Sequence, residues 1–215
     1  MITIWGRATS SNVQTAMWAL AELGLEHQRL DWGGAFGGND DPDYRAMNPN
    51  GLIPVLKDGD TVLWESPAIL RYLGARYGDE AFWPADPAKR ARLDMWAEWV
   101  KTSVCPEMIY KIFWHLVRTK EADRDQRVID SGVNALKMLM PRLDARLAQG
   151  EFLGGDSLCF ADIMAGHVLY RYYTVPFERA ETPGIDAYYA RLQERPAYRE
   201  HVMVSYESLR ATQGA

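Results

Sequence analysis

The stretch that most constrains the fold is residues 48–73, NPNGLIPVLKDGDTVLWESPAILRYL, because it predicts two strands, a tight turn and a helix in immediate succession. The apolar run at residues 53–56 predicts a short strand, and Asp58-Gly59 is a strong signal for a hairpin turn. The β-forming residues 61–64 predict the returning strand. The stretch therefore indicates a β-hairpin that leads directly into a helix.

The tripeptide Glu65-Ser66-Pro67 predicts where that helix starts. Serine is a preferred N-cap residue, and a proline in the first helical position loses no hydrogen bond, because that N–H has no partner within the helix. We therefore expect Ser66 as the N-cap and Pro67 as the first helical residue. In this arrangement Glu65 and Ser66 lie at the positively polarised end of the helix.

Pro54 opens the first strand of the hairpin, where a trans proline is normally confined to a sheet edge. We expect instead a cis Ile53-Pro54 bond in a tight turn. This bond would leave the backbone N–H and C=O of Ile53 free to pair with an extended, peptide-like ligand, while the helix N-terminus and the Ser66 hydroxyl receive its carboxylate. A proline before a strand or a serine at a helix start is mostly structural when it occurs alone, so the prediction rests on their combination.

A second unit precedes the hairpin. Residues 2–5 and 27–32 predict strands on either side of a helix over residues 13–23, which Gly24 ends. Such a β-α-β unit is right-handed in nearly all proteins. The polar loop at residues 9–12 delivers three side chains to the N-terminus of the helix.

The second half of the chain predicts helices only. Asp86-Pro87 is a helix start, with an N-cap residue and a proline in the first helical position. Apolar residues then recur at helical spacing through residues 88–119, where Pro106 should kink or divide the run, and through about 124–147, where Pro141 should bend it. No strand signal returns, so this half is predicted to be all-helical.

The run NPNGLIPVL followed by WESPAILRYL resembles the glutathione-binding half of a glutathione S-transferase, and the resemblance extends over nearly the whole chain. It implies an α/β thioredoxin-like N-terminal domain over residues 1–82 and an all-helical C-terminal domain over residues 87–215, usually in a homodimer. In that family the proline is cis, and an acidic residue and a serine hold the γ-glutamyl group. The residues implied to bind glutathione here are Ile53, Pro54, Glu65 and Ser66.

The segment LCFAD at residues 158–162 resembles the capping box of the family's second domain, in which serine or threonine normally stands at the N-cap. Here Cys159 stands at that position and is a poorer acceptor, whereas Asp162 can still reach back to a backbone N–H. We expect the departure to weaken this helix by about 1 kcal/mol unless Ser157 substitutes. The segment bears on folding and not on chemistry.

A transferase of this kind must present a thiolate, yet a thiol with a pKa of about 8.5 is only a few per cent ionised at neutral pH. A hydroxyl donor and a helix N-terminus lower a thiol pKa by stabilising the anion. The loop Ser10-Ser11-Asn12 offers such groups, and at least one of the three should simply cap the helix. The chain also resembles bacterial transferases with a Ser/Thr-Asn turn. Counting back from Gly24 to the position of the catalytic hydroxyl in serine-type transferases leads to Ser10, so the resemblance implies Ser10 first, Asn12 second and Ser11 third as the contact to the thiolate.

The second substrate, a small electrophile, is expected between the thiol and the helical domain. Near Pro106, the candidates for an apolar wall are Met108, Tyr110 and Trp114, although apolar residues at helical spacing belong more often to the core. Asparagine at residue 12, where a related class has cysteine, argues against thiol exchange through a mixed disulfide with the protein.

Composition excludes several other classes. A formal net charge of −5 without a long basic run argues against nucleic acid and anionic membranes as main partners. The sequence contains no uncharged apolar stretch of about twenty residues, and we expect a cytoplasmic protein with no membrane association. Cys105 and Cys159 form no C-x-x-C motif, so a disulfide scaffold, a zinc site and a dithiol centre lack support.

The sequence thus predicts a glutathione S-transferase that activates the thiol of glutathione, its co-substrate, for attack on small electrophiles without a metal. Conjugation, dehalogenation and isomerisation all fit this prediction. Two alternatives stay open. One is a glutathione-dependent dehalogenase or reductase, in which a second glutathione completes the cycle. The other is a binding module that keeps the fold and has no turnover.

Overall fold

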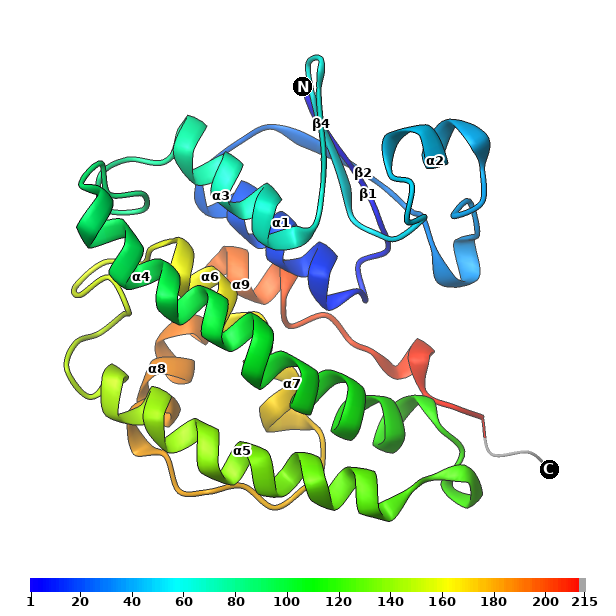
Figure 1. The fold of residues 1–215 in the computed structure, drawn as a ribbon, viewed down its shortest axis with the longest axis vertical. Helices are drawn as coiled ribbons and strands as arrows, with labels where there is room; N and C mark the ends of the chain where they lie inside the picture. Colours follow the sequence, from blue (N-terminus) through cyan, green and yellow to red (C-terminus); the bar gives the residue numbers. More distant parts are fainter. Residues whose placement is uncertain (213–215) are drawn as a thin grey trace.

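A mixed four-stranded sheet with neighbouring helices packs on a bundle of helices in the computed structural model, which describes residues 1–212 (Figure 1). The strands are β1 (Ile2–Trp5), β2 (His27–Leu30), β3 (Val55–Asp58) and β4 (Thr61–Trp64). They lie in the order β2-β1-β3-β4, with β1 parallel to β2 and antiparallel to β3. The predicted fold class, a thioredoxin-like α/β part followed by an all-helical part, is confirmed.

The hairpin β3–β4 has the tight turn that the sequence predicts. Asp58 pairs with Thr61, which leaves a two-residue turn between them. Gly59 in this turn has φ +58°, a left-handed conformation that glycine adopts without steric cost. The carboxylate of Asp58 also accepts hydrogen bonds from the hydroxyls of Tyr72 (2.7 Å) and Tyr77 (2.5 Å). The hairpin is therefore tied to the helix that follows it.

Three helices accompany the sheet: α1 (Ser11–Glu22), α2 (Pro42–Met47) and α3 (Ser66–Tyr77). In Figure 1, α1 and α3 face the helical bundle, whereas α2 lies apart from it beyond the sheet. Helix α2 is not among the predicted helices. Its local signal is Asp41, whose side chain caps the helix by accepting from the backbone N–H groups of Asp43 and Tyr44.

Helix α3 begins one residue earlier than predicted. The N-cap is Glu65, and Ser66 is already helical, so the expected cap at Ser66 is wrong. The physical reason lies in the backbone of Glu65, whose φ of +69° turns the chain out of β4 and directly into the helix. A residue other than glycine seldom adopts this conformation, and such outliers concentrate at functional sites.

The C-terminal part is a bundle of helices, with a short 3₁₀ helix (Glu121–Asp123) between η3 and α5 and another (Glu207–Leu209) after α9. Its main elements are α4 (Pro87–Trp99), η2 (Val100–Val104), η3 (Pro106–Arg118), α5 (Gln126–Leu147), α6 (Phe160–Gly166), α7 (Leu169–Thr174), α8 (Pro183–Glu194) and α9 (Pro196–His201). Within residues 1–212, no helix combines the length and the apolar character needed to cross a membrane.

Two expectations about these helices concern their start and their prolines. Asp86 caps α4 as predicted, since its side chain accepts from the backbone N–H of Ala88 at 2.8 Å. Pro106 does not end the helical run, because Cys105 keeps helical angles (φ −60°, ψ −42°) and the chain continues in wide, π-type turns on both sides. Pro141 likewise lies inside α5.

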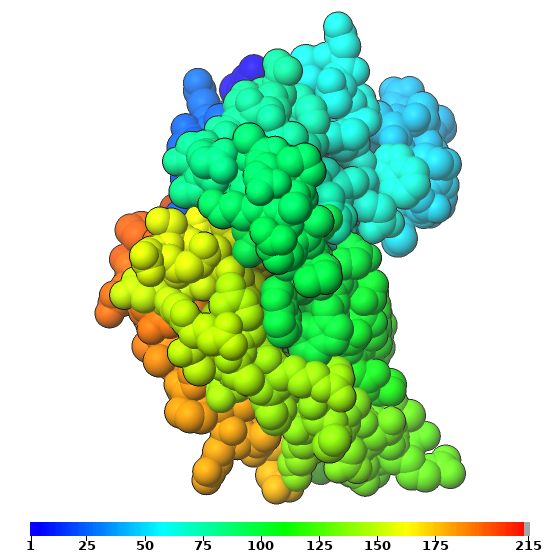
Figure 2. Space-filling view, turned by 60° about the vertical axis from the view of Figure 1, so that its left-hand side comes forward, coloured from blue at the N-terminus to red at the C-terminus, as the bar shows by residue number. Residues whose placement is uncertain are grey.

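The two parts of the chain are in direct contact, with the N-terminal part (blue to cyan) resting on the helices (green to orange) in Figure 2. Trp18 of α1 is fully buried there, and its ring meets the ring of Tyr198 on α9 edge-on at 4.8 Å between centroids. Its indole N–H donates to Glu22, which forms a two-pronged ion pair with Arg195 at 2.8 and 2.5 Å. Burial of one large aromatic ring and this ion pair together hold α1 on the bundle.

The predicted capping box at the start of α6 is present. Cys159 is the N-cap, and its backbone N–H donates to one carboxylate oxygen of Asp162 at 2.8 Å. The other oxygen accepts from the backbone N–H of Leu153 (2.8 Å) and from the hydroxyl of Tyr188 (3.0 Å). A single buried carboxylate thus joins the start of α6 to the preceding loop and to α8.

We expect Asp162→Ala to lower the free energy of unfolding by about 3 kcal/mol or more. The substitution leaves two backbone N–H groups without an acceptor in a buried site, and each such group costs about 1–3 kcal/mol. The Tyr188 hydroxyl loses its 3.0 Å bond and keeps only a 3.4 Å contact to the backbone carbonyl of residue 162. Urea unfolding followed by circular dichroism measures the change. The exposed Asp156 lies in the loop before α6, so Asp156→Ala is the matched control and should change stability by less than about 0.5 kcal/mol. Equal stability of the two variants would contradict the structural role of Asp162.

Candidate functional site

A groove of about 290 Å³ lies between the β1–α1 loop and the helix η3 of the bundle. It gathers most of the predicted site residues from both parts of the chain. The predicted residues that line it are Ser10, Ser11, Asn12, Ile53, Tyr110 and Trp114. The groove therefore joins the candidate thiol-activating loop, the corner before Pro54 and two of the three candidates for the apolar wall.

Ser10 stands at the N-cap of α1, and its hydroxyl makes no hydrogen bond to the helix backbone. The carbonyl of Ser10 accepts from Gln14 N–H at 2.9 Å, and its own N–H donates to the carbonyl of Arg7 at 3.1 Å. Because backbone bonds alone hold this residue, its hydroxyl can act as a donor toward the groove. The positive end of α1 lies at the same place.

Asn12 connects three elements of the chain. Its carboxamide oxygen accepts from the hydroxyl of Ser66 (3.3 Å) and from the ammonium group of Lys101 in η2 (2.8 Å). Two donors at the oxygen fix the orientation of the amide and leave its NH₂ group as a donor. Ser66, which does not itself line the groove, is thereby linked to the residue that does. The sequence analysis did not select Lys101, since no local pattern relates it to a residue 89 positions away.

The Ile53-Pro54 bond is cis, as predicted. The loop before it is held by the carbonyl of Leu52, which accepts from the Tyr44 hydroxyl and from the Asn48 side chain, both at 2.8 Å. Tyr44 belongs to α2, so the helix that the sequence analysis missed supports this corner. The side chain of Asn48 is buried, which explains the value of an asparagine at the start of the NPNG run.

The predicted apolar wall is only partly in place. Tyr110 and Trp114 line the groove and are 62% and 42% exposed, whereas Met108 has no exposed surface and lies in the hydrophobic core. The prediction for Met108 fails because residues two positions apart on a helix point to different sides. Residues four apart share a side, and the series from Tyr110 through Trp114 reaches Arg118, which also lines the groove. Helical spacing could therefore have identified Arg118.

Three arginines, Arg7, Arg118 and Arg171, line the groove, and among residues 1–212 no acidic residue does. Burial lowers the pKa of Arg7, and the nearby charge of Arg118 lowers that pKa further. Arg171 is almost completely buried and donates to the side chain of Gln14 (2.6 Å) and to the carbonyl of Thr9 (2.9 Å). Burial lowers the pKa of Arg171 to about 10, so it stays protonated at neutral pH. The groove is cationic in a chain whose net charge is −5.

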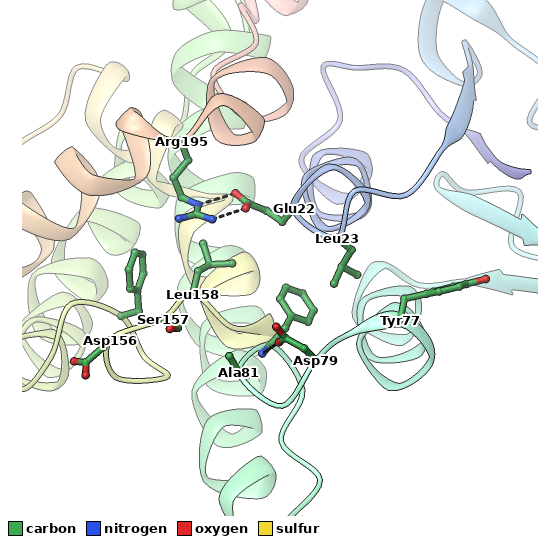
Figure 3. Close-up of a pocket in the computed structure, with 11 residues that line it drawn as sticks. Glu22, Leu23, Tyr77, Asp79, Ala81, Asp156, Ser157, Leu158 and Arg195 are labelled. Carbon is green, nitrogen blue, oxygen red and sulfur yellow. Dashed lines mark hydrogen bonds and ion pairs between the residues drawn. The ribbon is translucent and has the colours of Figure 1, made fainter.

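A larger hollow, of about 470 Å³, opens at another contact between the two parts of the chain (Figure 3). None of the predicted site residues lines it. Figure 3 shows the ion pair between Glu22 and Arg195 inside it, with both charged groups already bonded to each other. This hollow belongs to the contact between α1 and the bundle, and we do not assign the chemistry to it.

The cysteines supply no reactive group to the groove. Cys105 and Cys159 are both buried and unbridged, and neither lines it. Burial raises the pKa of Cys105 to about 12 and raises that of Cys159 as well, so both stay protonated at neutral pH. In the described part of the chain, no group of three or more His, Cys, Asp or Glu side chains is arranged to hold a metal ion.

Comparisons with known proteins identify the family. The family model for the N-terminal domain of glutathione S-transferases matches residues 9–76, and the one for the C-terminal domain matches residues 94–196. The chain is also 39% identical over 206 residues to glutathione S-transferase GstB of Escherichia coli (strain K12), covering 95% of this chain and 99% of that protein. The chain belongs to the glutathione S-transferase family.

Two further relatives agree with this assignment. A theta class glutathione S-transferase from Xanthomonas axonopodis pv. citri, whose crystal structure has glutathione bound, shows 46% identity and a TM-score of 0.90, with 95% of this chain and 98% of that chain covered. Glutathione S-transferase 3 of Zea mays is 32% identical over 209 residues, covering 94% of this chain and 93% of that protein. The predicted enzyme class, a glutathione transferase, is confirmed.

We expect Lys101→Met to raise the KM of this transferase for glutathione about tenfold, with little change in kcat. The substitution removes a hydrogen bond from a charged donor to Asn12, beside the hydroxyl of Ser66 on the predicted γ-glutamyl side. Initial rates at varied glutathione concentration measure the effect. Lys137 lies in α5 and pairs with Glu178, and it does not line the groove. The control variant Lys137→Met should keep the parent's KM for glutathione. A Lys101→Met enzyme with the parent's KM would show that the bond to Asn12 does not support glutathione binding.

Proposed function

We propose that this transferase binds glutathione along the corner that precedes Pro54 and joins it through its sulfur to small electrophiles held in the groove. The observation that carries the proposal is the convergence of the Ser10–Asn12 loop, Ile53 and the aromatic side of η3 on one cavity. A thiol donor, a place for its peptide backbone and an apolar wall for a second substrate are then within one site.

The proposed binding mode uses each element for one part of the tripeptide. The backbone N–H and C=O of Ile53 pair with the backbone of glutathione, as a strand edge pairs with an extended peptide. The γ-glutamyl carboxylate lies at the N-terminus of α3, where Ser66 and the unpaired N–H groups attract an anion. Glu65, exposed at the N-cap of the same helix, accepts from the γ-glutamyl ammonium group.

Activation of the thiol follows from the other side of the groove. The Ser10 hydroxyl donates to the sulfur, and the positive end of α1 stabilises the thiolate further. The NH₂ group of Asn12 is the second donor in line, and Ser11 is the third. The thiolate attacks the electrophilic carbon, a C–S bond forms, and the leaving group departs with the electron pair of the broken bond.

Two assays separate the proposed transferase from its alternatives. Conjugation of chlorodinitrobenzene tests thiol transfer, and halide release from a haloacid tests a dehalogenase. Binding of glutathione without activity in either assay would identify a non-catalytic binding module. A reductase that completes its cycle with a second glutathione would release oxidised glutathione, which is measured in the same reactions.

We expect Ser10→Ala to lower kcat about tenfold or more while the KM for glutathione changes little, because the hydroxyl stabilises the thiolate and not the bound tripeptide. Ser66→Ala should do the reverse and raise the KM for glutathione, since its hydroxyl lies on the γ-glutamyl side. The pH dependence of thiolate absorbance in the complex gives a direct reading, with a higher thiol pKa in Ser10→Ala. Parent-like turnover in that variant would transfer the role to Asn12 or Ser11.

We propose further that the enzyme is a homodimer and that α4 and α5 contribute to its interface. A shallow hollow on these helices is lined by Met95, Trp96, Trp99 and Arg142. Met95 is 63% exposed and Met138 on α5 is also exposed, which is unusual for large apolar side chains unless a partner covers them. An aromatic and methionine-rich centre with an arginine at its edge is typical of protein interfaces.

We expect Met95→Lys to convert the proposed dimer to a monomer at micromolar concentration, because the change places a charge in an apolar interface. Sedimentation velocity measures the mass of parent and variant. Gln149→Lys adds the same charge at an exposed site past the end of α5 and should leave the mass unchanged. A parent that sediments as a monomer, or a dimer that survives Met95→Lys and Met138→Lys together, would rule out this interface.

We place the proposed reaction in the cytoplasm and assign it a role in detoxification. Two free cysteines and a glutathione substrate suit a compartment in which glutathione keeps thiols reduced.

A further inference from the structure

Three arginines from separate elements of the fold line the groove. Arg7 comes from the β1–α1 loop, Arg118 from the end of η3, and Arg171 from α7. An adjoining hollow is lined by Arg7 and Arg118 as well. Of the described residues that line this hollow, Asp31 alone is acidic, and it is already paired with Arg29 at 2.5 Å.

These charges have no carboxylate partner within residues 1–212. None of the three arginines forms an ion pair there, although Arg171 is almost completely buried and Arg7 is partly so. Bringing cations together while removing them from water is unfavourable unless an anion joins them. The arrangement therefore fits a site that an anionic group completes on binding.

The geometry favours a carboxylate over a compact point charge. A guanidinium group offers parallel N–H donors that match the two oxygens of a carboxylate. The guanidinium of Arg118 lies over the ring of Trp114, 4.0 Å from its centroid, which holds its plane in one orientation. Gly34 leaves open the space beside the Arg7 side chain, since an added Cβ would lie only 3.2 Å from its Nε.

The anion is not the γ-glutamyl carboxylate of glutathione in the proposed binding mode. That group lies with Ser66 and the N-terminus of α3, beside Lys101, whereas the arginines meet η3 and the loop at Gly34. Next to the arginines the wall is aromatic, with Tyr110 and Trp114. A ligand with an apolar body and a carboxylate at one end matches this aromatic wall and the arginines beside it.

We propose that the electrophile of this transferase carries a carboxylate, which Arg7 and Arg118 bind while its apolar body lies against Tyr110 and Trp114. This proposal rests on the proposed function and names the class of its second substrate. For a chloroarene acid, the thiolate attacks the carbon that bears chlorine, and a C–S bond replaces the C–Cl bond. Chloride leaves with the bonding electron pair, and the proton of the thiol has passed to solvent.

Arg171 has a different role. Its guanidinium is occupied by Gln14 and by the carbonyl of Thr9, and it also lies 5.1 Å from the ring centre of Phe113. It holds the loop that carries Arg7 and Ser10 and adds its charge to the field of the site. Arg7 and Arg118 are therefore the residues to substitute, because neither has a side-chain bond that supports the fold within the described residues.

The test compares 4-chloro-3-nitrobenzoate with 4-chloro-3-nitrobenzamide, which differ in charge and hardly in shape, at saturating glutathione. Relative to the uncatalysed rates, the parent enzyme should favour the acid at least tenfold in kcat/KM. Arg118→Gln and Arg7→Gln should each lower kcat/KM for the acid about tenfold and change that for the amide less than twofold. Arg127→Gln removes an exposed arginine that does not line the groove and should change neither.

A second measurement does not depend on turnover. Calorimetry with the glutathione-saturated protein should show tighter binding of 3-nitrobenzoate than of 3-nitrobenzamide in the parent, and equal binding in Arg118→Gln. Equal affinity for acid and amide in the parent would overturn the proposal even if chlorodinitrobenzene is conjugated. A raised KM for glutathione in both arginine variants, with either substrate, would assign the arginines to the glycyl carboxylate of glutathione instead. Absence of turnover with every electrophile would contradict the proposed function. The calorimetric comparison of acid and amide would then decide by itself whether Arg7 and Arg118 bind a carboxylate.

Discussion

The contact of α1 with the helical bundle is the interaction on which the rest of this structure depends. Trp18 buries its whole side chain between the two parts, and Glu22 at the end of the same helix pairs with Arg195. Seven residues before Trp18, the helix begins at the loop that forms the floor of the groove. Because α1 is one rigid element, the packing that fixes its C-terminal half also sets the distance between Ser10 and the wall at η3.

Charge is distributed unevenly in this transferase, because a negative net charge coexists with a positively charged groove. The chain has five more acidic than basic residues, yet the groove is lined by three arginines and, in the part of the chain that the structure describes, by no acidic residue. In the proposed mechanism, the arginines bind the anion of the second substrate, while the Ser10 hydroxyl and the N-terminus of α1 stabilise the thiolate. A groove without Arg7 and Arg118 would still lower the pKa of the thiol, but it would lose the selection of an anionic second substrate.

The features that depend on short segments of the chain could be predicted from the sequence. The hairpin turn at Gly59, the cis bond at Pro54 and the capping carboxylate of Asp162 all depend on residues within a few positions of each other. Two predictions are wrong because neighbouring positions in the sequence fit the same local pattern. The N-cap of α3 is Glu65 and not Ser66, because the left-handed backbone of Glu65 already turns the chain into the helix. Met108 lies in the core because a residue two positions before Tyr110 on a helix points to a different side.

The sequence by itself determined the order and type of most elements, the corner at Pro54 and the family to which the chain belongs, since backbone geometry and helix starts follow from neighbouring residues. Only the tertiary structure decided that Lys101 meets Asn12 and that Arg118 lies on the same groove as Arg7. Contacts between distant segments depend on how whole helices pack, and that packing is a sum over many buried side chains. No local pattern records its outcome, so the cationic character of the groove became visible only in three dimensions.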